Sequence, residues 1–155
     1  MPQGLREEIK QTRPFPRRSA EAALSVMRTA AMLEHELNDV LKPSGLTATQ
    51  YNVLRILRGA GEKGLCGREV GARLVAPVPD VSRLLERMED VGLLSRERDA
   101  NDRRHVTTRL TEAGRRVLES VTPALEAVER ARFGRLSESA LQAMINSLAQ
   151  VRENP

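Results

Sequence analysis

The stretch RLLERMEDVGLLSRERDANDRR, residues 83–104, decides the fold, because it joins a helix directly to a charged hairpin. Apolar residues recur at helical spacing in its first half, and Gly92 ends that helix. Its second half predicts two strands, residues 93–98 and 104–110, around the polar tip 99–103. We therefore expect a helix with a β-hairpin directly after it.

The residues before this stretch predict further short helices. A helix over residues 67–74 is followed by the turn VAPVP and then by the helix 79–91, since proline is well tolerated at a helix start. Further upstream, Thr47 and Gln50 form a capping box, which predicts a helix that runs to about residue 58. Two short helices joined by a tight turn, the second with polar residues at its N-terminal end, are typical of a helix-turn-helix.

Long helices flank this unit on both sides. Residues 19–41 carry two apolar stripes at helical spacing, and Thr111 and Ser137 are placed as N-caps of two further helices. A helix that is apolar on two sides usually packs between layers or against another subunit. These helices are therefore expected to bury apolar surface outside the helix-turn-helix.

The length and composition indicate one domain after a short arm. The 155 residues suffice for one domain with a sizeable core. Residues 1–18 contain three prolines and more basic than acidic side chains, so we expect a loosely ordered basic arm. The fold class predicted for residues 19–155 is mainly α with a small β-hairpin.

The charged and aromatic residues narrow the class of partner. The formal net charge is +4, and nearly all of the basic side chains are arginines, whose planar fork suits phosphate and guanine. Genomic base-composition bias explains the same arginine excess equally well. Phe15, Tyr51 and Phe133 are the only aromatic residues, too few for the stacking platforms of single-strand and RNA binders. A nucleic-acid partner is therefore expected to be duplex DNA.

Other classes of protein find no support in the sequence. Cys66 is the single cysteine and, with two histidines, makes no zinc motif, so neither a metal nor a cofactor is expected. No nucleophile has a plausible base and no phosphate-binding loop is present, so the chain is not expected to be an enzyme. No apolar run reaches the roughly 18 residues of a membrane span, and the N-terminus lacks a signal-peptide core. We expect a cytoplasmic protein with no membrane partner.

Three segments together resemble the MarR family of winged-helix transcription regulators. They are LTATQYNVLRIL (46–57), GLCGREVGARL (64–74) and VSRLLERMEDVGLLSRERDANDRRHVTTRLTEAGRRVL (81–118). The resemblance implies a winged-helix DNA-binding lobe over about residues 46–112, with dimerisation helices at about 19–42 and 112–151. It also implies a homodimer on a pseudo-palindromic duplex operator, acting as a repressor of a nearby operon and released by a small-molecule effector.

The resemblance assigns the helix 79–91 to the major groove. Ser82 and Arg83 occupy positions at which the family contacts bases or phosphates, and Arg87 lies one turn further on, toward the DNA backbone. An ion pair with neighbouring carboxylates on the same helix is an equally good interpretation of Arg87. Asp80 departs from the family pattern: it either accepts a hydrogen bond from a cytosine amino group or favours the helix N-terminus.

The same resemblance assigns the wing, residues 96–109, to the minor groove. One of Arg103 and Arg104 is expected to enter the groove, and the other to pair with Asp99 or Asp102, so that the carboxylate holds the hairpin in shape. Two more wing arginines alternate on the first strand and share a face, and one of them is expected to reach phosphate: Arg96 and Arg98.

Other candidate residues concern regulation. The family's effector pocket tends to lie near the DNA-binding lobe, which makes His35, Tyr51 and Arg55 the candidates here. A histidine on a helix is more often structural or solvated. Cys66 is interpreted as a small helix-cap residue rather than a redox sensor. The alternative function is a winged-helix module that binds another protein without sequence-specific DNA binding.

Overall fold

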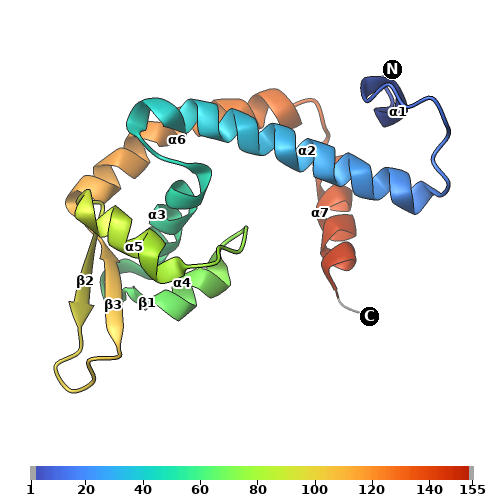
Figure 1. The fold of residues 1–155 in the computed structure, drawn as a ribbon. Coiled ribbons are helices and arrows are strands. Elements are labelled where there is room, and N and C mark those ends of the chain that lie inside the picture. Colours follow the sequence, from blue (N-terminus) through green and yellow to red (C-terminus); the bar gives the residue numbers. More distant parts are fainter. Residues whose placement is uncertain (1–2, 154–155) are drawn as a thin grey trace.

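The computed structural model describes residues 3–153, and it is built of helices around one small sheet (Figure 1). Two short 3-10 helices, Lys42–Ser44 and Gly61–Lys63, connect longer elements. The α-helices and strands are α1 (Leu5–Glu8), α2 (Arg18–Leu41), α3 (Ala48–Ala60), β1 (Leu65–Cys66), α4 (Gly67–Arg73), α5 (Val81–Asp90), β2 (Leu94–Arg98), β3 (Val106–Leu110), α6 (Glu112–Phe133) and α7 (Glu138–Arg152). The predicted fold class, mainly α with a β-hairpin wing, is confirmed.

Local capping signals fix where several of these helices begin. The Thr47 hydroxyl accepts the Gln50 N–H and the Gln50 side chain accepts the Thr47 N–H, which completes the predicted capping box of α3. Thr111 and Ser137 cap α6 and α7 as expected. The helix predicted over residues 79–91 begins two residues later than expected, because Asp80 is its N-cap and Val81 its first residue.

The hairpin belongs to a sheet of three strands, in the order β1-β3-β2, all antiparallel. The pairing of β1 with β3 was not predicted, since two residues are too few to show an alternating pattern. Gly64, just before β1, has φ +66°, and a Cβ there would lie 2.6 Å from the Thr108 carbonyl oxygen. Only glycine lets the chain approach β3 this closely.

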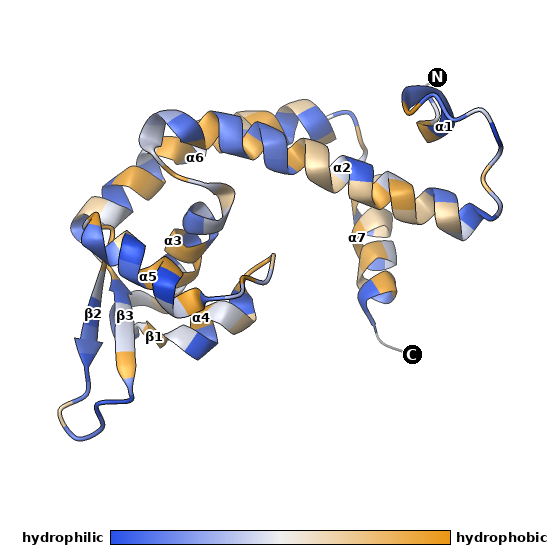
Figure 2. Cartoon of the chain, viewed as in Figure 1, coloured by the Kyte–Doolittle hydropathy of each residue, from blue (hydrophilic) through white to orange (hydrophobic). Residues whose placement is uncertain are grey.

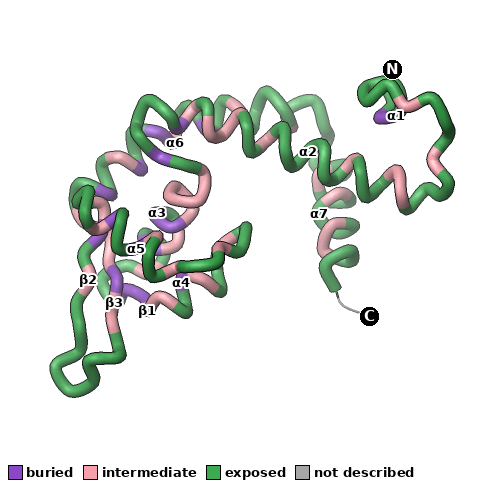
Figure 3. The backbone as a smooth tube through the Cα atoms, in the orientation of Figure 1, coloured by how far each residue is buried: buried purple, intermediate pink, exposed green. Residues whose placement is uncertain are grey.

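A single apolar core lies within the helix-turn-helix lobe (Figure 3). It joins the C-terminal end of α2 and the first half of α6 to α3, α4, α5 and the base of the wing. Its largest fully buried side chains, all below 2% exposure, include Leu41, Leu54, Leu57, Leu85 and Leu118. The core thus fixes how α5 and the wing sit relative to each other.

The flanking helices extend beyond this core. Helices α2 and α6 lie side by side, and α7 extends away from this pair, apart from the helix-turn-helix lobe (Figure 1). α7 has no buried residue, and hydrophobic residues recur along both α2 and α7 (Figure 2). Several of these apolar side chains are exposed, among them Leu24, Val26, Met27, Ile145 and Val151.

The N-terminal arm is more ordered than expected. It forms the single helical turn α1, and Leu5 is buried. Leu5 lines a hollow of about 350 Å³ together with Met32 of α2 and Phe133 of α6. An apolar contact therefore holds part of the arm against the flanking helices.

Candidate DNA interface

Helix α5 presents a polar face outward and an apolar face inward. Leu85 and Met88 are buried in the core, whereas Ser82, Arg83 and Arg87 are exposed. This arrangement leaves the three polar side chains that were assigned to DNA free to meet a partner. All three lie on the same short helix, whose width and exposed face fit a major groove.

Asp80 acts as the N-cap of this helix. Its Oδ1 accepts the backbone N–H of Arg83 at 3.0 Å. Of the two interpretations drawn from the sequence, the structure supports the favourable interaction with the helix N-terminus. One carboxylate oxygen is committed to the cap, and the side chain is exposed at the start of the recognition helix.

The wing tip is held by carboxylates that accept backbone N–H groups. Asp99 Oδ1 accepts from Asn101 at 2.7 Å and from Asp102 at 3.1 Å, and Asp102 Oδ1 accepts from the Arg104 N–H at 3.0 Å. The hydrogen bond from the Asn101 N–H, followed by that from the Asp102 N–H, lowers the pKa of Asp99 below its ordinary value. Both carboxylates therefore bind backbone groups of the hairpin tip.

The manner in which they shape it corrects the prediction. Within residues 3–153, no ion pair joins the guanidinium of Arg103 or Arg104 to Asp99 or Asp102. The expected arginine–carboxylate pair is wrong, because nearby backbone donors in the turn satisfy the carboxylates first. Arg103 and Arg104 both stay exposed at the tip.

Arg96 lies in a different environment from the other wing arginines. Its side chain is only 17% exposed, and Nη1 lies 3.5 Å from Glu86 Oε1 and 4.0 Å from Glu89 Oε2. Arg98, by contrast, is exposed and makes no ion pair within the described part of the chain. Of the two arginines, one of which was expected to reach phosphate, Arg98 is the exposed one.

This result also bears on Arg87. An ion pair with Glu86, Glu89 or Asp90 was the alternative to a DNA contact, but no ion pair involves Arg87 among residues 3–153. Glu86 and Glu89 face Arg96 instead. The sequence could not show this, since the partner comes from the strand that follows the helix.

A hollow of about 950 Å³ lies between α4, the N-terminal half of α5 and the wing. Its lining includes Arg68 of α4, Ser82 of α5, and Arg104 and His105 just before β3. Basic side chains thus border the space between the recognition helix and the hairpin. A DNA backbone passing between the two grooves would run along this border. Arg68, which was not singled out in the sequence, joins the candidate interface through this arrangement.

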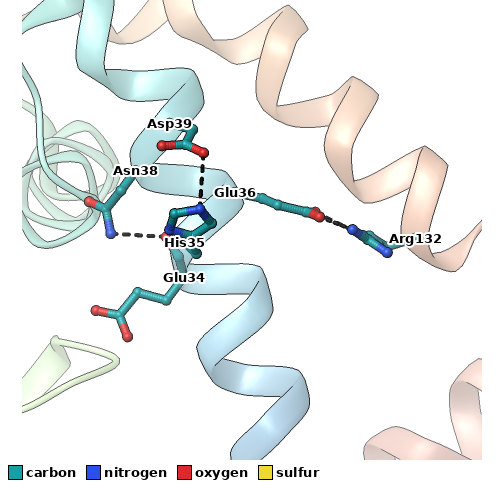
Figure 4. Close-up of polar contacts among 6 residues, drawn as sticks. All are labelled: Glu34, His35, Glu36, Asn38, Asp39 and Arg132. Carbon is teal, nitrogen blue, oxygen red and sulfur yellow. Dashed lines mark hydrogen bonds and ion pairs between the residues drawn. The ribbon is translucent and has the colours of Figure 1, made fainter. Parts of the chain in front are cut away.

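The candidate effector residues do not meet in a pocket. His35 is exposed on α2, and its Nε2 lies 3.3 Å from Asp39 Oδ2 (Figure 4). The Arg55 guanidinium lies 5.9 Å from the centre of the Tyr51 ring, a cation–π contact on α3. These residues line neither of the two hollows described above. The pocket prediction finds no support in the single chain.

Glu36 and Asn38, in the C-terminal half of α2, link this helix to α6 and α3. Glu36 pairs with Arg132 of α6, and the Asn38 amide donates to the Glu34 carbonyl oxygen (Figure 4). The side-chain oxygen Oδ1 of Asn38 also accepts the Ala48 N–H at the start of α3. The C-terminal half of α2 therefore connects the flanking helices to the lobe.

Cys66 occupies the N-cap position of α4. Its N–H donates to Glu69 Oε2 at 2.8 Å, and this hydrogen bond lowers the pKa of Glu69 below its ordinary value. The interpretation of Cys66 as a small cap residue agrees with this geometry.

No group of three or more His, Cys, Asp or Glu side chains within residues 3–153 could hold a metal ion. Across the same residues, every helix is too short or too polar to span a membrane.

Comparison with known proteins agrees with this geometry. A family model described as the MarR family matches residues 44–105. The transcriptional regulator HosA of Escherichia coli O127:H6 (strain E2348/69 / EPEC) is 35% identical over 107 residues, which cover 69% of this chain and 73% of HosA. The chain belongs to the MarR family. It is therefore a DNA-binding transcription regulator, and the prediction that it is not an enzyme is confirmed.

Solved structures of MarR-family regulators place the whole fold in this family. CouR from Rhodococcus jostii RHA1, bound to p-coumaroyl-CoA, is 26% identical with a TM-score of 0.72, over 88% of this chain and 95% of CouR. CouR is also solved as a transcriptional repressor bound to a 23-mer DNA duplex, with a TM-score of 0.68. BpsR from Bordetella bronchiseptica, whose DNA binding is regulated by 6-hydroxynicotinic acid, is 26% identical with a TM-score of 0.76, over 86% of this chain and 99% of BpsR.

Proposed function

We propose that this MarR-family chain is a homodimeric repressor that acts in the cytoplasm on a pseudo-palindromic duplex operator. Helix α5 lies in the major groove, and the wing reaches the adjacent minor groove. The observation that carries this proposal is the exposed pair Arg103 and Arg104, at a tip held by Asp99 and Asp102, beside the exposed polar face of α5. Arginine on a firmly held hairpin is suited to a narrow, negative groove.

The roles of single residues follow from their exposure. Ser82 and Arg83 contact bases or phosphates, and Arg87 contacts the backbone. Arg98 reaches phosphate from the wing strand. One of Arg103 and Arg104 enters the minor groove. Each of these side chains is exposed and free of ion pairs within the described residues, which leaves its donors available to DNA.

The dimer proposal rests on apolar surface that the single chain leaves uncovered. The exposed apolar side chains of α2 and α7 belong to helices with little or no buried surface of their own. A helix with an exposed apolar stripe is stable when another layer covers it. A second copy of the chain supplies this cover through α2, the end of α6 and α7. It also gives two recognition helices, as a two-fold operator requires.

Release by a small effector is the regulatory part of the proposed function. CouR is solved with p-coumaroyl-CoA, and the DNA binding of BpsR is regulated by 6-hydroxynicotinic acid. By analogy with these two proteins, a small-molecule effector releases this chain from its operator. A pocket at His35, Tyr51 and Arg55 would have to be completed by the partner subunit, since the single chain leaves His35 in solvent.

A binding titration tests the proposal directly. The purified protein is titrated against the DNA that flanks its own gene, at two salt concentrations, with scrambled DNA of the same length as competitor. We expect tight retardation that resists the competitor and weakens steeply with salt, because neutralised phosphates release counterions. If the scrambled DNA competed the protein away from the flanking DNA, the flanking DNA would not contain the operator. If a stable protein partner were then recovered, the winged helix would be a protein-interaction module.

A further inference from the structure

Arg96 connects the two elements that contact DNA. It belongs to strand β2 of the wing, yet its guanidinium lies against Glu86 and Glu89 of α5. The backbone N–H of Arg96 also donates to Glu89 Oε1 at 3.0 Å. One residue of the wing thus makes both backbone and side-chain contacts with the recognition helix.

The two carboxylates are suited to hold one guanidinium. Glu86 and Glu89 are three residues apart on α5 and therefore lie on the same helix face. The polypeptide between α5 and β2 is the short segment Val91–Leu93, in which Gly92 has φ +78°. The apolar core holds α5 against the base of the wing at Leu94, and Arg96 adds a polar contact two residues further along β2.

The surroundings of Arg96 argue against a direct DNA contact. Its Nε is buried and has no hydrogen-bond partner. Thr108, opposite Arg96 across the β2–β3 ladder, is 1% exposed, and its hydroxyl is likewise buried and unpaired. Arg96 also lines the hollow beside α5, but its guanidinium would have to leave both carboxylates before it met a phosphate. Arg98, two residues further along β2, is exposed and has no such restraint.

We propose that Arg96 is a positioning residue, which fixes the wing to the recognition helix so that both grooves are contacted by one rigid unit. It acts through Glu86 and Glu89, and it does not touch DNA. The effect on DNA binding rests on the function proposed above, but the coupling of wing to helix is a property of the free protein. We expect this ion pair to stabilise the arrangement of wing and helix more than a fully exposed ion pair would, because most of the Arg96 side chain is buried.

Two measurements on the same variants test this assignment. Arg96→Met keeps a long apolar side chain and removes the charge. Arg98→Met, on the same strand, is the matched control for the first measurement alone, because Arg98 is itself proposed to contact phosphate. The first measurement is amide hydrogen exchange of the free protein. We expect Arg96→Met to speed exchange in the wing and in the C-terminal half of α5, and Arg98→Met to leave it unchanged. Equal exchange in the wild type and Arg96→Met would overturn the proposal.

The second measurement is operator affinity as a function of salt. We expect Arg96→Met to weaken binding about ten-fold with an unchanged slope of log affinity against log salt, since no phosphate contact is lost. A slope reduced by about one would instead identify Arg96 as a phosphate contact and overturn the proposal. If the wild type bound no DNA, the proposed function would fail, whereas hydrogen exchange would still decide the coupling.

A second variant guards against misfolding of Arg96→Met. Glu86→Gln combined with Glu89→Gln removes the partner charges from more exposed positions and leaves the arginine in place. The proposal expects the same faster exchange in the wing. Wild-type exchange in this double variant would show that the carboxylates do not hold Arg96 and would overturn the assignment.

Discussion

Asp99 shows how one carboxylate can organise a hairpin tip. A single oxygen accepts two backbone N–H groups. Both hydrogen bonds are stronger when the carboxylate is charged, which favours the charged form. The tip arginines need no carboxylate partner and stay exposed. At the residue scale, the acids of the wing therefore set its shape, and the arginines are available to bind.

The charge of Asp99 should persist into strongly acidic solution. Because the Asn101 and Asp102 N–H groups lower its pKa, its contribution to stability is complete above the ordinary aspartate value of about 3.9 and is lost as the pH falls through the lowered pKa. An NMR titration of the Asp99 carboxyl carbon should give a midpoint below that ordinary value. A midpoint at or above it would show that the two hydrogen bonds do not form in solution.

The two tip arginines should differ in their effect on DNA binding. Replacing each in turn by alanine should weaken operator binding, by about 1–3 kcal/mol for the side chain that enters the groove and by less for the other. Competition binding at fixed salt gives both values. Arg135→Ala is the matched control, since it removes one exposed arginine at the turn between α6 and α7, far from the wing (Figure 1). Wild-type affinity in both tip variants would exclude a minor-groove role.

At the scale of the element, α5 depends on its cap. Asp80→Ala should lower the free energy of unfolding by about 0.5–2 kcal/mol, because the Arg83 N–H loses its acceptor. Asp80→Asn keeps an acceptor oxygen and removes only the negative charge at the helix N-terminus, so it should unfold close to the wild type. Urea denaturation of the three proteins measures this. Equal destabilisation by Asn and Ala would mean that the charge, and not the hydrogen bond, supports the helix.

Two helical glycines should respond in opposite ways to alanine. A Cβ on Gly114 of α6 would lie 2.1 Å from the Leu93 carbonyl oxygen, so Gly114→Ala should destabilise the fold by about 1–3 kcal/mol. Gly59 of α3 has nothing within 4 Å of such a Cβ, and Gly59→Ala should stabilise the fold by up to about 1 kcal/mol. Thermal or urea unfolding compares them. Stabilisation by Gly114→Ala would show that α6 does not pack this closely against the wing.

At the scale of the whole molecule, α7 is the clearest sign of an assembly. Ile145→Glu places a charge on its exposed apolar face and should convert a dimer to a folded monomer, since no residue of α7 is buried within its own chain. Analytical ultracentrifugation measures the mass, and circular dichroism checks the fold. Gln150→Glu, on the polar side of α7, is the matched control and should stay dimeric. A wild-type monomer, or a dimeric Ile145→Glu protein, would contradict the proposed interface.

Local signals in the sequence determined most of the elements. The capping box at Thr47, the caps Thr111 and Ser137 and the glycine stop at Gly92 all act within a few residues, so their effect can be predicted from neighbours alone. The charged hairpin after the recognition helix belongs to the same class. These signals together gave the family resemblance that the comparisons confirm.

Only the tertiary structure decided which partner each side chain meets. Glu36 and Arg132 are 96 residues apart in the chain. Strand β1 pairs with β3, although α4, α5 and β2 lie between them in the chain. The same holds for Arg96, which the sequence placed beside Arg98 and the fold places against α5. Hydrogen bonds of caps and turns depend on residues within one turn, whereas ion pairs and burial depend on how whole elements pack. The sequence by itself therefore determined the helices, the hairpin and the family, and the packing of the lobe decided which wing arginines face solvent.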